Sequence, residues 1–215
     1  MTEIPLIARV GLQSLVLRDP ALATIEADAG QLPWRTRPGG FTGLLQAIVA
    51  QQISNAAASA IWRRMVADEA PLDPHRLLAM APEALQGLGL SRPKVSHARS
   101  LAQAFVEGSL SQAGIAALDD EAAIAAITRV RGLGRWTAEV YLLFAEQRMD
   151  VFPANDVALA GAAMALHALE TRPSERALRL LAERWRPHRA LAARLLWHHW
   201  RHLTGRPAMD DLPPA

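Results

Sequence analysis

The sequence contains no cysteine. Without thiols the chain cannot form disulfides, zinc–thiolate sites or cysteine-ligated iron–sulfur clusters. Lysine is nearly absent as well: Lys94 is the only one, so arginine carries almost all of the positive charge. Valine, isoleucine, threonine and tyrosine are sparse beside alanine, leucine and arginine, and this composition favours helices over sheets.

Two kinds of segment are missing too. No stretch of about 18 uncharged apolar residues is present, so we expect no membrane span. The first residues, MTEIPLIARVGLQ, lack the basic-then-apolar order of a signal peptide, and we therefore expect a cytoplasmic protein. With 215 residues, 51% of them hydrophobic, the chain can bury one sizeable core or form one domain with two lobes.

Positive charge gathers near the end of the sequence although the net charge is only +2. Nine arginines lie between Arg172 and Arg206, against Glu175 and Glu183. A guanidinium group matches the geometry of a phosphate, so this segment could contact a nucleic-acid backbone. A solvated helix surface is the alternative, and charge alone favours it.

Prolines and capping residues divide the chain into about ten helices with short connections, which predicts an all-α fold. The expected helices are a short one from Asp19–Pro20, a long one from Phe41 to Val66, short ones from Asp73–Pro74 and Ala81–Pro82, and then Pro93–Val106, Ser111–Leu118, Asp120–Thr128, Trp136–Gln147, one starting near Asp156, Glu175–Trp185 capped by Ser174, and His188–Leu203.

A glycine-rich turn, RVRGLGRWTAEVYL, separates two of these helices. Gly132 and Gly134 flank Leu133, and glycine permits the positive φ values that a tight turn needs. The amides of these residues and of the following helix start would form a small anion-binding site, to which Arg131, Arg135 and Thr137 can add side-chain contacts. An ordinary glycine-capped helical hairpin is the alternative.

Five separated segments together resemble one known family. ITRVRGLGRWTAEVYLLF is similar to the helix–hairpin–helix DNA-binding motif, and DVFPANDVALAG follows it after about twenty residues. LLQAIVAQQISNAAASAIWRRM, LGLSRPKVSHARSLAQAF and ERWRPHRALAARLLWHHW also resemble the helix–hairpin–helix DNA glycosylase superfamily. The resemblance extends from about Phe41 to Trp200 and points to the 3-methyladenine DNA glycosylase II (alkylbase) branch.

The resemblance implies a catalytic role for Asp156. A carboxylate there would stabilise positive charge on the sugar while the N-glycosidic bond breaks, and would orient or deprotonate water. Asp156 also fits a helix N-cap, and both roles can hold. In the lyase-competent branches of the superfamily, a lysine occupies the position of Trp136. Tryptophan offers no amine nucleophile, so we expect a monofunctional enzyme.

Aromatic residues would line the base pocket. The Trp136 indole could line this pocket, because a tryptophan face attracts a cationic alkylated base, and a core tryptophan is the alternative. The resemblance implies a second pocket aromatic at Trp197. Tyr141 is expected to be a core residue first and a pocket wall second. Trp185 and Trp200 are expected in the core. AQQIS stands where the family carries the residue that fills the gap left by a flipped base, which suggests Gln52 with Gln51 as its support.

The family's hairpin often holds a monovalent cation, Na+ or K+, through main-chain carbonyls. By position these would belong to Thr128, Val130 and Leu133, and no other cofactor is implied. A rival metal reading uses His198 and His202, which are four residues apart on one helix, but no third ligand is evident.

Together these inferences describe one glycosylase domain spanning 1–215, with two helical lobes and a cleft between them. We expect lobe one at about 42–155, lobe two at about 1–41 plus 156–205, and a loose tail at 206–215. The expected partner is double-stranded DNA containing damaged bases, without membrane contact. We expect a monomer that is cytoplasmic and associated with the nucleoid when bound to DNA. A non-catalytic DNA-binding protein and a glycosylase for other damaged bases are the alternatives.

Overall fold

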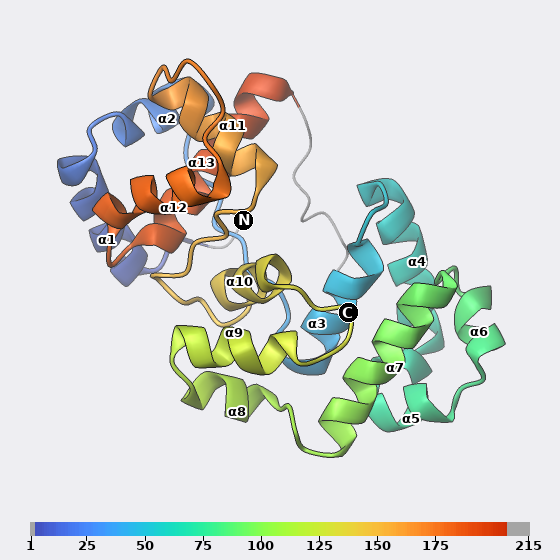
Figure 1. Cartoon of the computed structure of the whole chain (residues 1–215). Coiled ribbons are helices and arrows are strands. Elements are labelled where there is room, and N and C mark those ends of the chain that lie inside the picture. Colours follow the sequence, from blue (N-terminus) through green and yellow to red (C-terminus); the bar gives the residue numbers. More distant parts are fainter. Residues whose placement is uncertain (1–2, 206–215) are drawn as a thin grey trace. The chain divides into compact units, whose positions relative to one another are not determined.

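The computed structural model describes residues 3–205, and this part of the chain is all-α (Figure 1). It contains thirteen α-helices, two short 3₁₀-helices and no β-strand. The fold class expected from composition and capping signals is therefore confirmed. The tail predicted at 206–215 lies outside the described residues.

The described chain divides into two compact units. We call Arg37–Tyr141 the central unit, and the residues up to Thr36 together with those from Leu142 onward the terminal unit. The bounds of the units differ from the expected lobe bounds. The chain enters the central unit at Arg37 rather than at about residue 42, and it leaves this unit after Tyr141 rather than after about residue 155. This second boundary lies inside one helix, α10 (Arg135–Phe144), which no sequence signal divides.

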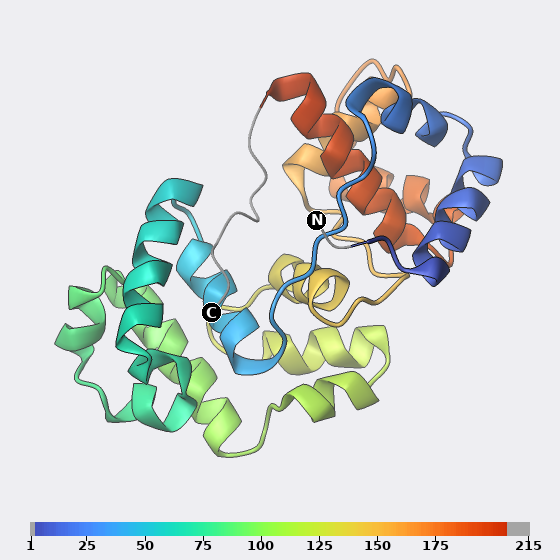
Figure 2. The same cartoon turned by 180° about the vertical axis from the view of Figure 1, so that it is seen from behind.

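The terminal unit is built around α13, which packs against α1, α2 and α11, while α12 packs against α11 (Figure 2). Leu191, Ala192 and Leu196 on α13 are fully buried in this packing. The helices of the unit are α1 (Leu6–Arg18), α2 (Leu22–Ala29), α11 (Val157–Leu166), α12 (Glu175–Ala182), η2 (Glu183–Trp185) and α13 (Arg189–Thr204).

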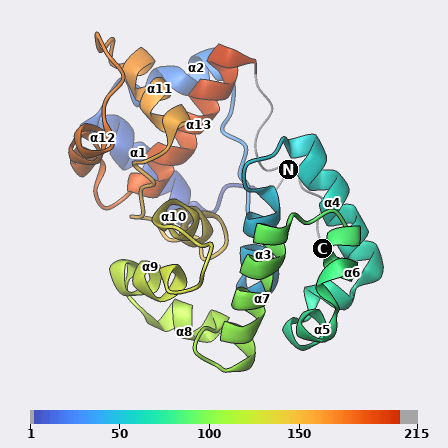
Figure 3. The same ribbon diagram turned by 45° about the vertical axis from the view of Figure 1, so that its right-hand side comes forward.

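The central unit is built around α7, which packs against α3, α5 and α6, while α8 lies beside α9 (Figure 3). Ala98 and Leu101 of α7 and Leu44 and Ile48 of α3 are fully buried. The remaining helices are α3 (Gly40–Ala50), α4 (Asn55–Asp68), η1 (Ala70–Leu72), α5 (Pro74–Ala79), α6 (Pro82–Gly87), α7 (Arg92–Val106), α8 (Gln112–Ala117) and α9 (Asp120–Thr128).

The long helix predicted from Phe41 to Val66 is wrong. The chain breaks between α3 and α4, where Gln52 has a φ of 56°, a left-handed value that no α-helix contains. Ser54 then starts α4 as its N-cap, and its hydroxyl accepts a hydrogen bond from the Ala57 amide at 3.2 Å. The continuous apolar pattern hid this break, because it carries on across both helices.

Most other helix starts follow their sequence signals. Asp73, Ser111, Asp156 and Ser174 each cap the helix expected after them. Helix α1 was not predicted, and its N-cap residue Pro5 makes no side-chain capping bond that could have marked its start. Within residues 3–205 no helix is long and apolar enough to cross a membrane.

Candidate functional site

The glycine-rich turn joins α9 to α10. Its hydrogen bonds are tight and local, from the Val130 amide to the Ile127 carbonyl and from the Leu133 amide to the Val130 carbonyl, each 3.1 Å. Gly132 has a φ of 91°, whereas Gly134 does not take a positive φ. The turn therefore requires glycine conformation at Gly132 and not at Gly134.

Two side chains from distant segments brace Gly132. The Gln51 side-chain amide donates a hydrogen bond of 2.9 Å to the Gly132 carbonyl. On the other side the His97 ring lies so close that a Cβ atom at Gly132 would overlap it. The Nδ1 atom of His97 is buried and has no hydrogen-bond partner among the described residues. The sequence does not mark His97 as part of this site, because packing against a glycine leaves no residue pattern.

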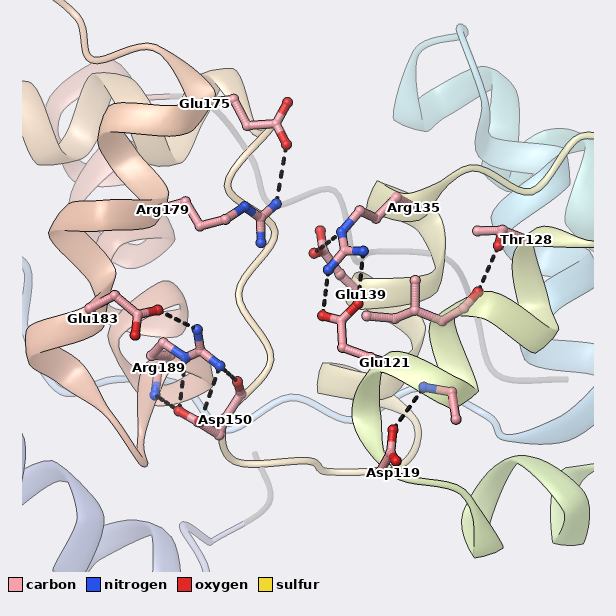
Figure 4. A network of polar contacts seen from close by, with 12 residues as sticks. Asp119, Glu121, Thr128, Arg135, Glu139, Asp150, Glu175, Arg179, Glu183 and Arg189 are labelled. Carbon is pink, nitrogen blue, oxygen red and sulfur yellow. Dashed lines mark hydrogen bonds and ion pairs between the residues drawn. The ribbon is translucent and has the colours of Figure 1, made fainter.

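The side chains expected to bind phosphate differ in their surroundings. Arg131 is exposed, whereas Thr137 is buried. The Arg135 guanidinium pairs with Glu121 at 2.6 Å and with Glu139 at 2.9 Å (Figure 4). The hydrogen bond to Glu121 raises the pKa of Arg135. DNA contacts by the hairpin amides, Arg131, Arg135 and Thr137 therefore all stay predictions.

The carbonyls expected to hold a monovalent cation belong to the same turn. The Thr128 hydroxyl donates back to the Ile124 carbonyl at 2.8 Å, and the Val130 carbonyl accepts the Leu133 amide. A carbonyl oxygen has two lone pairs, so the Val130 bond leaves it able to ligate a cation. The monovalent cation site at these carbonyls therefore stays a prediction.

The rival metal reading finds no further support. In the described part of the chain no group of three His, Asp or Glu side chains could hold a metal ion. The Nε2 atom of His198 lies 2.9 Å from the Gly30 carbonyl, with which it forms a hydrogen bond. His198 thus fastens α13 to the end of α2.

Asp156 stands at the N-terminus of α11. Its Oδ1 atom accepts hydrogen bonds from the amides of Ala158 at 2.8 Å and Leu159 at 3.0 Å, which confirms the N-cap expectation. The side chain is 8% exposed, while the next residue, Val157, is 64% exposed. Two helix amides therefore fix the Asp156 carboxylate beside an exposed residue, and its catalytic role stays a prediction.

The segment before Asp156 is a buried loop rather than a flexible one. Its four residues from Val151 to Ala154 are all buried. At its start the Asp150 carboxylate accepts hydrogen bonds of 2.9 Å from both Arg186 and Arg189, and Glu183 pairs with the same two arginines. Figure 4 shows the contacts of Arg189 with Asp150 and with Glu183. These arginines of the basic segment therefore hold the loop, a role that charge counting did not suggest.

The candidate pocket aromatics fall into two groups. Trp136 is half-buried, and Tyr141 is buried with its hydroxyl accepting a hydrogen bond of 2.8 Å from the Gly40 amide. Trp197 is half-buried and stacks on Phe144, with ring centroids 5.5 Å apart. The core reading of Tyr141 is confirmed, and the pocket roles stay predictions.

The buried Arg194 supports the Trp197 group. Its guanidinium lies 4.6 Å from the centre of the Phe144 ring and 4.2 Å from that of Trp34. It also donates to the carbonyls of Arg35 at 2.7 Å and Leu143 at 3.0 Å. By sequence Arg194 belongs to the basic segment expected at the surface, whereas in the structure its side chain is buried and links these rings to two backbone carbonyls.

The two other tryptophans of the last helices pack inside the terminal unit. Trp185 is fully buried and donates its indole hydrogen to Asp19 at 2.8 Å, which confirms its core role. Trp200 is half-buried against Gly161, where a Cβ atom would collide with the indole.

The predicted residues thus belong to different units. The hairpin, Trp136, Gln51 and Gln52 lie in the central unit, and the structure joins Gln51 directly to the hairpin. Asp156 and Trp197 belong to the terminal unit.

Comparison with known proteins agrees with this arrangement of motifs. The family model described as HhH-GPD superfamily base excision DNA repair protein matches residues 45–187. DNA-3-methyladenine glycosylase 1 of Schizosaccharomyces pombe is 30% identical over 161 residues, which are 73% of this chain and 71% of that protein. DNA-3-methyladenine glycosylase 2 of Escherichia coli is also 30% identical, over 72% of this chain and 55% of its own length.

Solved structures of alkylbase glycosylases are similar to this chain as well. A DNA-3-methyladenine glycosidase from Bacillus halodurans has 28% identity and a TM-score of 0.78, with 88% of each chain covered. The S. pombe glycosylase Mag1, solved in complex with abasic DNA, has 27% identity and a TM-score of 0.76, covering 90% of this chain and 95% of its own. The chain belongs to the HhH-GPD superfamily of base excision DNA repair proteins, in its alkylbase DNA glycosylase branch.

Proposed function

We propose that this protein is a monofunctional DNA glycosylase, acting as a monomer, that removes alkylated bases of the 3-methyladenine and 7-methylguanine type from double-stranded DNA. The observation that carries the proposal is the Asp156 carboxylate, fixed by two helix amides at the end of a buried, ion-paired loop. The relatives named 3-methyladenine glycosylases and the Mag1 complex with abasic DNA support it.

Asp156 acts on the sugar in this mechanism. As the N-glycosidic bond breaks, positive charge develops on the sugar, and a nearby carboxylate stabilises it. The same carboxylate orients a water molecule and accepts its proton, so that water completes the hydrolysis. The capping bonds hold Oδ1 in place, and they spare the protein from reorganising this group during the reaction.

Trp136 restricts the proposed reaction to base removal without strand cleavage. An amine at this position would attack the sugar carbon and lead to strand cleavage, whereas an indole cannot form a Schiff base. The aromatic faces of Trp136 and Trp197 instead bind the flipped base, and the positive charge of an alkylated purine strengthens the contact. The product is therefore free base and an intact abasic strand.

The hairpin grips the DNA backbone in this proposal. Amides of Gly132, Gly134 and the start of α10 bind a phosphate, and Arg131 adds a charged contact. The carbonyls of Thr128, Val130 and Leu133 would hold a monovalent cation, which supplies positive charge next to that phosphate. Gln52 fills the space that the flipped base leaves.

The variant Asp156→Asn tests the catalytic role apart from the structural one. Asparagine caps a helix about as well as aspartate, so we expect the free energy of unfolding to change by less than about 0.5 kcal/mol. Without the carboxylate, release of 3-methyladenine and 7-methylguanine from methylated duplex DNA should fall by at least about a hundredfold. Asp119→Asn, at the N-cap of α9, is the matched control, and it should keep full activity.

Three outcomes would contradict the proposal. Absence of base release by the wild-type protein would favour a non-catalytic DNA-binding role. Full activity of Asp156→Asn would remove the carboxylate from the mechanism. A covalent protein–DNA adduct trapped by borohydride would show an amine nucleophile and overturn the argument from Trp136.

A further inference from the structure

The segment between α3 and α4, Gln51–Ser54, stands out from the helices around it; we call it the tip. Gln52 is exposed with its backbone in the left-handed region, and the apolar residue Ile53 after it is 37% exposed. A glutamine with positive φ persists only where its surroundings hold the backbone in place, and such strain gathers at functional sites.

The first hold on the tip comes from Gln51. Its side-chain amide reaches across to the hairpin and donates 2.9 Å to the Gly132 carbonyl, 81 residues away in sequence. This bond ends on the one hairpin residue whose backbone conformation demands glycine. The start of the tip is therefore tied to the point where the hairpin turns.

The second hold comes from the only lysine of the chain. Lys94 at the start of α7 is 8% exposed, and its Nζ atom donates 2.7 Å to the Val49 carbonyl in the last turn of α3. Burial lowers the pKa of this amine, so the position carries a desolvation cost. At the other end Ser54 caps α4, so the tip is fastened on both sides.

From these contacts we propose that Gln51 and Lys94 are positioning residues: Gln51 fastens the tip to the hairpin, and Lys94 fixes the last turn of α3, from which the tip leaves. The phosphate grip of the hairpin and the insertion of Gln52 and Ile53 into the base stack then act as one preassembled device. The apolar side chain of Ile53 enters the stack together with Gln52, as apolar wedges do in other DNA-distorting proteins. The inference rests on the proposed function, because it assigns a further task to the same DNA-binding surface.

The test separates DNA binding from insertion. The probe is a duplex with a stable tetrahydrofuran abasic analogue and 2-aminopurine opposite it, whose fluorescence rises when insertion displaces that base. Binding of the same duplex is followed by anisotropy of an end label. Neither measurement needs base excision, so loss of insertion can be told apart from loss of catalysis.

The main variant is Gln51→Met, which keeps the length of the side chain and removes its donor. We expect binding within about threefold of wild type, because the hairpin amides remain, but an insertion equilibrium about tenfold lower, the size of one lost hydrogen bond. Lys94→Met should show the same split. The matched control is Gln86→Met, whose amide bonds only to Pro82 in its own helix; it should equal wild type.

A fluorescence rise of Gln51→Met equal to that of wild type would overturn the proposal. So would a parallel loss of binding and insertion, since Gln51 would then only support the hairpin. Gln52→Gly guards against a folding defect, because glycine relieves the positive φ and should raise stability while it abolishes most of the fluorescence rise. No rise with the wild-type protein would remove the tip from DNA insertion altogether.

Discussion

Two structural constraints require glycine at position 132: the backbone conformation and the space available for a side chain. Its backbone has a φ of 91°, and the His97 ring fills the space where a side chain would begin. Gly134, two residues later, has neither constraint, because open space surrounds its missing Cβ. The pair therefore allows a comparison in which the substitution is identical and only the surroundings differ.

We expect Gly132→Ala to lower the free energy of unfolding by about 2 kcal/mol, from the positive φ and from the overlap with His97. Gly134→Ala should stay within about 0.5 kcal/mol of wild type. Urea denaturation measures both. Adding His97→Ala to Gly132→Ala should restore part of the loss, and a strictly additive double variant would show that the ring exerts no pressure on this position.

Among single residues, the sequence marked the candidate site residues more clearly than the residues that support them. Asp156 and the hairpin glycines were found because motif and spacing mark them. His97, Gln51 as a hairpin ligand and Arg194 as an internal brace depend on contacts between segments far apart in the chain. Such contacts follow from tertiary packing, and a single sequence carries no pattern for them.

Among the elements, the buried loop before α11 depends on a cluster of charges. Asp150 accepts from Arg186 and Arg189, and Glu183 ties the two arginines together. The side chain of Arg189 is 13% exposed, whereas the pair of Arg179 with Glu175 on α12 lies further into solvent. Figure 4 shows both ion pairs, Arg189 with Asp150 and Arg179 with Glu175. We expect the more buried pair to contribute more to the free energy of unfolding.

Asp150→Ala should lower the free energy of unfolding by about 2 kcal/mol, because the mostly buried Arg189 guanidinium keeps Glu183 but loses its contacts with the Asp150 carboxylate. For a chain of this length the melting temperature would fall by about 4 to 8 °C. Glu175→Ala is the matched control, with an expected loss below about 0.5 kcal/mol. Equal losses in calorimetry would contradict a special role for the Asp150 cluster.

Helix boundaries were predictable where a cap or proline marks them, as at Asp73 and Ser174. They were not predictable where the mark is a backbone angle. The apolar pattern from Phe41 to Val66 continues through the tip, so only the left-handed conformation of Gln52 reveals that two helices are present. Helix α1 lacked a capping side chain and was missed for a related reason.

For the molecule as a whole, acid sensitivity should reflect a buried histidine. His199 on α13 is buried, and desolvation lowers its pKa more than the nearby Asp28 raises it, while His202 and His198 lower it further. The unfolded chain therefore binds the proton first as the pH falls. Stability should decline from about pH 6.5 downward, until the lower pKa of the folded state is reached.

Replacing this residue should flatten the pH profile. We expect His199→Met to lose less unfolding free energy than wild type between pH 7 and pH 5, since the unfolded chain then gains no proton there. His75→Met, at an exposed histidine on α5, should keep the wild-type slope. Urea denaturation at a series of pH values provides the measurement, and identical slopes for His199→Met and wild type would disprove this origin.

The division into two units has a consequence for how the chain is made. The central unit is one continuous stretch, whereas the terminal unit joins the beginning of the chain to its last third. During synthesis α1 and α2 emerge long before α13, against which they pack. Until then Leu15, Leu22 and Ile25, which are buried in the folded protein, lack these packing partners. Because domains generally fold as units during translation, the central unit can fold first, and the terminal unit, which contains Asp156, is completed last. A nascent chain would thus form its hairpin before it forms the unit that contains Asp156.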